Sequence, residues 1–243
     1  MSGPLLESFE ERLQEIDAFL DLLDAIQTQA REGPPRIGDA TITTQQQRIL
    51  YSSVYLQLYN LVEATATWCI NAVSMATFDG VRWKPKDLID ALRREWVRST
   101  ARTHVTLNSG NRLSEAVAFC DLLLASVPIT EWWVERGGGG NWDDSAIESI
   151  TERVGCDLAI DPAVNTAAKR HIRDDKNCLG LVKDLRNRLA HGTISFEECG
   201  DAVTVVDLRD VRDRTANYLR EVVVAFRDFI DNHHFLTPDS RPS

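Results

Sequence analysis

The stretch from Thr44 to Met75 contains neither glycine nor proline. Its apolar residues recur at helical spacing on more than one face, which is the pattern of a helix that is buried on several sides. Thr44 is followed three residues later by Gln47, and this spacing is a capping-box signature for the start of a helix. The sequence therefore predicts a long central helix against which the other segments pack.

Other segments also show helical periodicity between breaks made by glycine and proline. Leu5 to Ala30 has an apolar stripe and an acidic outer face, which favours packing against the bundle or a partner over contact with RNA. Leu208 to Ile230 is predicted to be the last long helix. Shorter helices are predicted over residues 86–98, 113–126, 143–154 and 162–173.

Two stretches favour extended structure. Residues 102–107 alternate in polarity, and the β-branched residues 202–206 form either a short strand or an apolar connection. One strand cannot make a sheet, so the chain is predicted to be an all-α bundle of up-and-down helices. Residues 1–236 are expected to form one domain, with a loop-rich middle at 80–160 and a disordered tail at 237–243.

Composition limits the classes of protein that this chain can belong to. It has 243 residues, of which 43% are hydrophobic, so it can bury a sizeable core. No apolar run approaches the roughly 18 residues of a membrane span, and no signal segment precedes the first helix, so a cytoplasmic protein is expected. The five cysteines include no C-x-x-C pair, which indicates reduced thiols rather than disulfides or a zinc site.

The segment from Leu179 to Gly192 is predicted to be an amphipathic helix that ends at its glycine. A glycine just past the last helical residue can adopt the left-handed conformation, which places His191 in the final turn beside unpaired carbonyls. That end of the helix dipole favours the charged imidazolium. Asn187 lies one turn before His191, and Arg186 is long enough to bend toward a phosphate shared with it.

The sequence Arg186-Asn187-Arg188-Leu189-Ala190-His191 resembles the R-x(4-6)-H motif of the HEPN superfamily, all-helical ribonucleases of toxin–antitoxin, phage-defence and CRISPR systems. The residues that follow, 195–200, and the long last helix are similar to the standalone, MAE-type HEPN nucleases. The resemblance is good over 44–78 and 174–232 and weak between them. The alternative is that Arg186 and Asn187 lie on a solvated face and that His191 and Gly192 form an ordinary helix end.

The resemblance implies a metal-independent endoribonuclease that needs no cofactor, because the 2'-hydroxyl of RNA supplies the nucleophile. His191 would act as general base or acid, Arg186 would stabilise charge on the phosphoryl oxygens, and Asn187 would orient one of them. The expected products are a 2',3'-cyclic phosphate and a 5'-hydroxyl. Only one motif occurs, so the resemblance also implies a homodimer with a composite site.

A fourth site residue, Glu63, follows from a second similarity. Tyr59 and Glu63 are spaced i, i+4, like the Tyr-x-x-x-Glu pairing in the first core helix of some HEPN nucleases. The resemblance thus implies that Glu63 faces Arg186, with simple solvent exposure or a pairing elsewhere as the alternative.

Charge predicts where RNA would bind. The formal net charge is −10, but residues 169–191 hold seven bases and three acids, a local charge of +4 that leaves −14 on the remainder. Such a zone suits a grip on a few phosphates without adhesion to every RNA, although a solvated basic face is the alternative. The candidate RNA-binding residues are Lys169, Arg170, Arg173, Lys183 and Arg188.

Residues 128–141 have an unusual composition, with two tryptophans before Gly137 to Gly140 and a third, Trp142, directly after the stretch. No Lys-Ser or Lys-Thr follows the glycines, so a surface loop is predicted rather than a P-loop. Trp132, Trp133 and Trp142 either stack on bases or anchor the loop.

The predicted partners are an RNA substrate, a second copy of the chain, and an antitoxin or other defence-system protein. The rival function is a non-catalytic HEPN-like module, an interaction or regulatory subunit that binds a partner protein or a nucleotide. Such a module would bind through other surfaces and would never cleave RNA.

Overall fold

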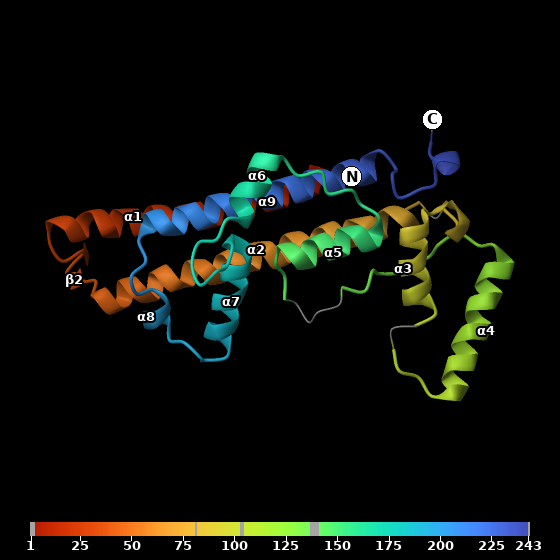
Figure 1. Ribbon diagram of the computed structural model, residues 1–243, viewed down its shortest axis with the longest axis horizontal. Coiled ribbons are helices and arrows are strands. Elements are labelled where there is room, and N and C mark those ends of the chain that lie inside the picture. The colour runs from red at the N-terminus through yellow and green to blue at the C-terminus, as the bar shows by residue number, and fades with distance from the viewer. Residues whose placement is uncertain (1–2, 81, 103–104, 137–140, 243) are drawn as a thin grey trace.

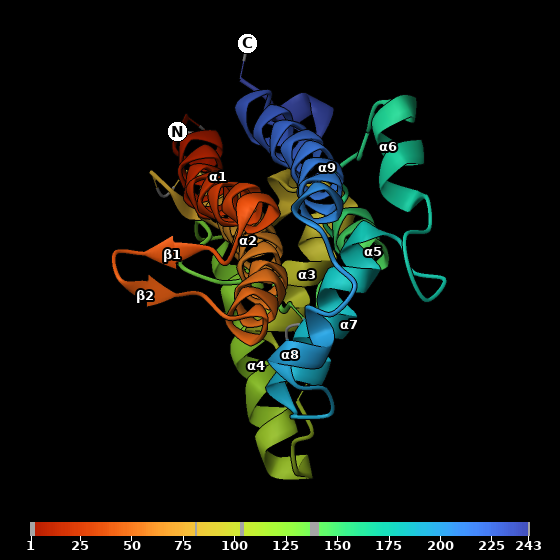
Figure 2. The same cartoon turned by 90° about the vertical axis from the view of Figure 1, so that its left-hand side faces the viewer.

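A computed structural model of the chain describes residues 3–80, 82–102, 105–136 and 141–242. Three long helices, α1 (Gly3–Glu32), α2 (Thr44–Phe78) and α9 (Val205–Asp231), form a bundle in which each contacts the other two (Figure 1). The view along the bundle in Figure 2 shows α7 (Cys178–Ala190) and α8 (Phe196–Cys199) on one side of it. The predicted all-α fold is confirmed. The strands of the described residues are β1 (Arg36–Ile37) and β2 (Ala40–Thr41), which pair as an antiparallel hairpin.

Helix α2 is the central helix that its sequence predicts. Leu58, Tyr59 and Val62 are almost completely buried, and α2 contacts α1, α7, α8 and α9. Its capping box lies one residue earlier than predicted. Thr43 has an extended backbone and accepts the Gln46 N–H through its hydroxyl at 3.2 Å, while its own N–H donates to the Gln46 side chain at 2.8 Å.

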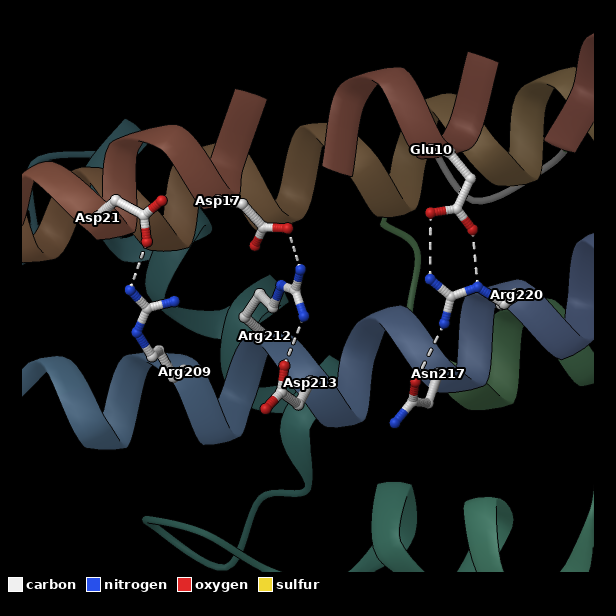
Figure 3. A network of polar contacts seen from close by, with 8 residues as sticks. All are labelled: Glu10, Asp17, Asp21, Arg209, Arg212, Asp213, Asn217 and Arg220. Carbon is white, nitrogen blue, oxygen red and sulfur yellow. Dashed lines mark hydrogen bonds and ion pairs between the residues drawn. The ribbon is translucent and has the colours of Figure 1, made fainter. Parts of the chain in front are cut away.

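Part of the acidic face of α1 lies beside α9 and pairs with its arginines, as Figure 3 shows. Arg209 pairs with Asp21 at 2.8 Å, Arg212 pairs with Asp17, and Arg220 pairs with Glu10 at 2.7 Å. These pairs agree with the prediction that the acidic face of α1 packs against the bundle rather than contacting RNA. Glu7, Glu11 and Glu15 remain exposed on the same helix.

The middle of the chain contains three helices, α3 (Asp90–Thr100), α4 (Ser109–Ala125) and α5 (Asp144–Val154), and a 3-10 turn, η1 (Pro85–Asp87). The predicted helix over 86–98 starts late because Leu88 forms a bridge with Leu236 and Ile89 donates to the Phe235 carbonyl at 3.0 Å, which keeps this stretch extended. The buried carboxylate of Glu95 joins α3 to α5 through Arg153 at 2.6 Å.

The bounds of two other helices differ from the predicted ones because of local backbone contacts. Helix α4 starts earlier than predicted because Asn108 caps it, accepting the Asn111 N–H at 2.9 Å. Helix α6 (Pro162–Lys169) is shorter than predicted because Arg170 already has an extended backbone, and the Ile172 N–H donates to the Lys176 carbonyl at 2.8 Å across the turn before α7.

Neither predicted extended stretch forms a strand among the described residues. Arg102 lies in a turn, and Thr103 and His104 fall outside the described residues. For the second stretch, the structure has a connection over residues 202–204 rather than a strand. Thr204 caps α9, accepting the Asp207 N–H at 3.2 Å, so Val205 already belongs to the helix.

Residues 237–242, for which the sequence predicts a disordered tail, contact the start of the middle region. The Thr237 N–H donates to the Asp87 carbonyl at 2.8 Å, and the Ser240 hydroxyl donates to the Asp87 carboxylate at 3.3 Å. A 3-10 turn, η3, spans Pro238–Ser240. The end of the chain is thereby connected to η1.

Helix α8 packs against α2 at Gly200. A Cβ atom added to Gly200 would lie 2.0 Å from the backbone carbonyl oxygen of Arg48, which cannot move without displacing α2. The glycine therefore permits the close approach of the segment that follows α7.

We expect Gly200→Ala to lower the free energy of unfolding by about 1–3 kcal/mol, because the added methyl group overpacks this contact. Urea unfolding followed by circular dichroism measures the change. The matched control is Gly110→Ala on α4, where the nearest atom lies at 3.6 Å and helix propensity favours alanine by about 0.8–1 kcal/mol. Equal unfolding midpoints for the two variants would contradict the proposed close approach.

Candidate active site

Helix α7 carries the motif residues and ends as its glycine predicts. Gly192 has a φ of +67°, its N–H donates to the Leu189 carbonyl at 3.2 Å, and the Thr193 N–H donates to the Arg188 carbonyl at 2.9 Å. Together these two hydrogen bonds form a Schellman motif. His191 is the C-cap residue of α7, and its side chain is exposed beside the C-terminal carbonyls of the helix.

The position of α7 is set by burial on one side and a cap at its start. Leu181, Val182 and Leu185 are at most 1% exposed, as the helical spacing predicts. The Asn177 side chain accepts the Gly180 N–H at 2.8 Å and donates to Asp144 of α5 at 2.9 Å. Burial of one face and the cap at its start therefore fix the position of α7.

The Arg186 side chain lies between two residues of α2. Its guanidinium carbon is 4.2 Å from the centre of the Tyr59 ring, and its Nη2 is 3.6 Å from Glu63 Oε2. Tyr59 is fully buried, and burial raises its pKa, so the ring is a neutral platform under the cation. The structure thus brings Glu63 to Arg186, as the sequence similarity implies, with both side chains partly open to solvent.

Asn187 connects Arg186 to a third segment. Its side-chain oxygen accepts a hydrogen bond from Arg186 Nη1 at 2.8 Å, and its amide nitrogen donates to the Asn141 side chain at 3.0 Å. The sequence indicates that Asn187 can reach His191. In the structure it is the Asn187 backbone carbonyl that does so, accepting the His191 N–H at 3.0 Å.

Residues 141–144, which were not predicted as part of the site, run along α7. Beyond the contacts of Asn141 and Asp144, the Trp142 N–H donates to the Tyr59 hydroxyl at 3.3 Å, and Asp143 pairs with Lys183. Four consecutive residues thus contact α2, α7 or the residue that caps the start of α7. The signal that could have found them is polar residues directly after a glycine run, although Gly137 to Gly140 lie outside the described residues.

Two of the three tryptophans near this loop are anchors. Trp132 is 5% exposed and donates from Nε1 to the Thr77 hydroxyl at 2.7 Å, and Trp142 is 4% exposed. Trp133 is exposed and packs edge-on against Phe78. Trp132 and Trp142 therefore anchor the loop. Of the three tryptophans, Trp133 is the one whose side chain is exposed to solvent.

A comparison with protein-family models matches residues 1–235 to the MAE_28990-like HEPN family. The chain belongs to this HEPN family. No curated protein and no solved structure matches the chain. Membership indicates a nuclease-like or RNA-related role for this HEPN chain. Across the part that the structure describes, no helix is long and apolar enough to cross a membrane.

The predicted RNA-binding residues of the HEPN chain do not form one continuous patch. Lys169 and Arg170 lie at the end of α6, whereas His191 follows α7, whose 13 residues span about 20 Å. Both views show α6 and the C-terminal end of α7 on different sides of the bundle (Figures 1 and 2).

Most of these HEPN cations also have acidic neighbours. Lys169 pairs with Glu148 at 2.6 Å, Lys183 pairs with Asp143, and Arg188 lies 3.7 Å from Asp184. Arg173 makes a loose contact with Asp174 at 3.9 Å. RNA binding by the five cations stays a prediction. Of the five, Lys183 and Arg188 lie on α7, the helix that also carries Arg186.

Four of the five HEPN cysteines are buried, and one is exposed. Among the described residues, no group of three His, Cys, Asp or Glu side chains could hold a metal ion. Cys69, Cys156, Cys178 and Cys199 are buried, and burial raises the pKa of Cys156 to about 12 and that of Cys178 to about 11. Cys120 is exposed on α4.

Proposed function

We propose that this HEPN protein is a metal-independent endoribonuclease, with His191, Arg186 and Asn187 as its catalytic residues and Glu63 as a supporting one. One observation carries the proposal. Arg186 is held on the face of Tyr59 and beside Glu63, next to a helix end that presents an exposed histidine. A cation and a proton carrier at one helix end are what transphosphorylation of RNA requires.

The reaction uses the substrate's own nucleophile. A general base removes the proton of the 2'-hydroxyl, the 2'-oxygen attacks the adjacent phosphorus, and the 5'-oxygen leaves with a proton from a general acid. The products are a 2',3'-cyclic phosphate and a 5'-hydroxyl. His191 performs one of the two proton transfers, and the His191 of a second copy performs the other.

Arg186 contributes by charge. Arg186 lies 3.6 Å from Glu63, which is the separation of a loose ion pair. A phosphate can therefore replace Glu63 beside the guanidinium without breaking a short hydrogen bond between the two side chains. The Tyr59 ring keeps the guanidinium in place during this exchange. The guanidinium is therefore already oriented when the phosphoryl oxygens bind to it. Its attraction for these oxygens strengthens as negative charge develops on them.

Asn187 holds the arginine and the loop together. By accepting from Arg186 and donating to Asn141, its amide fixes the direction of the guanidinium fork. When RNA binds, the same amide can turn a donor toward a phosphoryl oxygen. Asn187 thus acts next to Arg186 rather than on the proton.

The sequence holds one such motif, so a two-fold homodimer supplies the second histidine. An enzyme of this kind would act in the cytoplasm as a toxin or phage-defence effector, restrained by an antitoxin or another defence-system protein until it is needed. A non-catalytic HEPN-like subunit would carry the same residues and never cleave RNA.

The test is incubation of pure protein with total RNA in excess EDTA, followed by sequencing of the new 5' ends and analysis of the 3' ends. We expect cleavage that survives chelation and leaves 2',3'-cyclic phosphates, because no step requires a divalent ion. The His191→Ala protein serves as the control for contaminating nucleases. Strict dependence on an added divalent ion, or RNA binding without any cleavage, would contradict the proposal.

A further inference from the structure

A cavity of about 200 Å³ opens at Asn141, next to the candidate active site. Part of its lining comes from α5, at positions three or four residues apart that share one face of a helix. These residues are Ala146, Ser149, Ile150 and Arg153. The lining also includes Arg136, Asn141 and Trp142, which precede α5 in the chain. Within the part of the chain that the structure describes, no acidic side chain lines this cavity.

The buried part of the lining is apolar and the exposed part is polar. Trp142 is 4% and Ile150 3% exposed, whereas Arg136, Asn141 and Ser149 are exposed. A ligand in the cavity therefore meets a cation, an amide and a hydroxyl close to solvent. Such groups suit a small anion that keeps part of its hydration, because complete burial of a charge costs far more.

Arg153 brings positive charge that its acidic neighbour does not fully balance. Its Nε and Nη2 lie 3.3 Å and 2.6 Å from the buried carboxylate of Glu95, and Nη2 also donates to the Glu135 carbonyl at 2.9 Å. Glu95 pairs with Arg98 as well, at 2.8 Å. Two guanidiniums thus share one carboxylate, which leaves a net charge of +1 on the three side chains. Arg153 Nη1 takes part in none of these contacts and can donate to a ligand.

Arg136 is the second cation of the cavity. Its Nη2 donates to the side-chain oxygen of Asn71 on α2 at 3.2 Å, and a neutral amide does not balance the charge of the guanidinium. The cavity is therefore lined by two guanidiniums, although the chain as a whole has a formal net charge of −10. The planar fork of an arginine matches the oxygens of a phosphate.

Asn141 belongs both to this cavity and to the candidate active site. Its side-chain oxygen accepts a hydrogen bond from the Asn187 amide at 3.0 Å, and the Asn187 oxygen accepts one from Arg186 Nη1 at 2.8 Å. Two hydrogen bonds in series thus connect the cavity lining with the Arg186 guanidinium. Neighbouring groups of one bound molecule can therefore reach both places.

We propose that this cavity binds the phosphate next to the scissile phosphate of the RNA strand. Arg136 and Arg153 supply the charge, and the Ser149 hydroxyl donates to a phosphoryl oxygen. The assignment of this phosphate to RNA rests on the proposed function, in which Arg186 contacts the scissile phosphate. Because a nucleic-acid strand carries one charge per nucleotide, the groups that occupy the two places together are consecutive phosphates.

The cavity would contribute to catalysis by orientation. Binding energy from a part of the substrate that does not react can be used to position the part that does. A phosphate in the cavity also touches Asn141, and through it fixes Asn187 and the direction of the Arg186 guanidinium. The smallest RNA that uses both places has two phosphates, and therefore three nucleosides.

The binding test uses a short fluorescent RNA strand whose 2'-hydroxyls are all methylated, because such a strand lacks the nucleophile and is not cleaved. We expect Ser149→Glu to weaken its binding at least about 10-fold in fluorescence anisotropy, because the variant places a carboxylate where the phosphate binds. The matched control is Ser145→Glu, the same change at another exposed serine of α5 that lies outside the cavity lining. Both variants should keep the circular dichroism spectrum of the parent.

A second variant removes charge without adding any. Arg136→Gln should weaken binding about 5- to 10-fold, the loss of one charge-assisted hydrogen bond. It should also flatten the slope of log affinity against log salt by about 0.7, the contribution of one phosphate contact to a single strand. Arg94→Gln, at an exposed arginine of α3 that pairs with Asp90, should change neither quantity.

Inorganic phosphate distinguishes RNA from a free phosphorylated compound as the source of the bound phosphate. At constant ionic strength, we expect inorganic phosphate to displace the methylated strand from the parent protein and to lose most of this effect on Ser149→Glu. Calorimetric binding of phosphate that Ser149→Glu abolishes, without any displacement of the strand, would assign the cavity to a free ligand and overturn the proposal. Equal affinity of the strand for the parent, Ser149→Glu and Arg136→Gln would also overturn it, as would a parent that does not bind the strand.

Cleavage assays with unmodified RNA separate this inference from the proposed function. We expect Arg136→Gln and Ser149→Glu to raise KM and lower kcat/KM. Binding of the strand that depends on Ser149 and Arg136, in a parent that never cleaves RNA, would overturn the function and leave the cavity standing as an RNA-phosphate site. Cleavage by both variants with the parental KM and kcat would overturn the inference and leave the function standing.

Discussion

Replacement of His191 by alanine should lower kcat for RNA cleavage by about 100- to 10,000-fold, the range for loss of a positioned general acid or base. The loss should appear in kcat rather than in KM, because the exposed imidazole transfers protons and is not part of the packing of α7. Single-turnover cleavage of a defined RNA at saturating protein measures the chemical step.

The position of His191 allows a loss of catalysis to be separated from a loss of structure. His191 closes α7 through backbone hydrogen bonds, so His191→Ala should keep the circular dichroism spectrum, the unfolding midpoint and the dimer of the parent. A stable, dimeric His191→Ala protein that cleaves at the parental rate would remove His191 from the mechanism. His191→Gln, which keeps a polar side chain but cannot shuttle a proton near neutral pH, should be as impaired as the alanine variant.

Replacement of Arg186 by alanine should lower kcat by about 100- to 1,000-fold, comparable with removal of one preorganised charge donor. The effect on RNA affinity should be smaller, because the contact of the guanidinium with the phosphoryl oxygens strengthens only as charge develops. Arg186→Lys should restore little activity, since an ammonium lacks the planar fork that stacks on Tyr59 and donates to Asn187.

Alanine variants of two other arginines serve as controls for the Arg186→Ala measurement. Arg188→Ala should raise KM with little change in kcat, because Arg188 is a predicted phosphate contact two residues along α7. Arg227→Ala, at a partly exposed arginine of α9 that pairs with its neighbour Asp228, should change neither. Binding curves and saturating cleavage rates for the three variants separate affinity from catalysis. An Arg186→Ala protein that cleaves at the parental rate with saturating RNA would contradict the assigned role.

Much of the fold could be predicted because helices depend on local patterns. Periodicity located α1, α2, α7 and α9 to within a few residues at most ends, since each buries a continuous apolar stripe. Gly192 ended α7 as predicted because left-handed backbone is a local property of glycine. The errors at Thr43 and Thr204 arose where a second threonine or a β-branched run offered an equally good local interpretation.

The sequence by itself determined the helical class, the motif and the end of α7, because these depend on residues close together in the chain. Only the tertiary structure decided that Arg186 lies on Tyr59 and beside Glu63, more than 120 positions earlier, and that residues 141–144 run along α7. The tertiary structure also decided which cations of the basic segment have acidic partners. Lys169 pairs with a glutamate on α5, and Lys183 pairs with an aspartate just before α5. Contacts between distant segments depend on how the helices pack, which one-dimensional spacing does not contain.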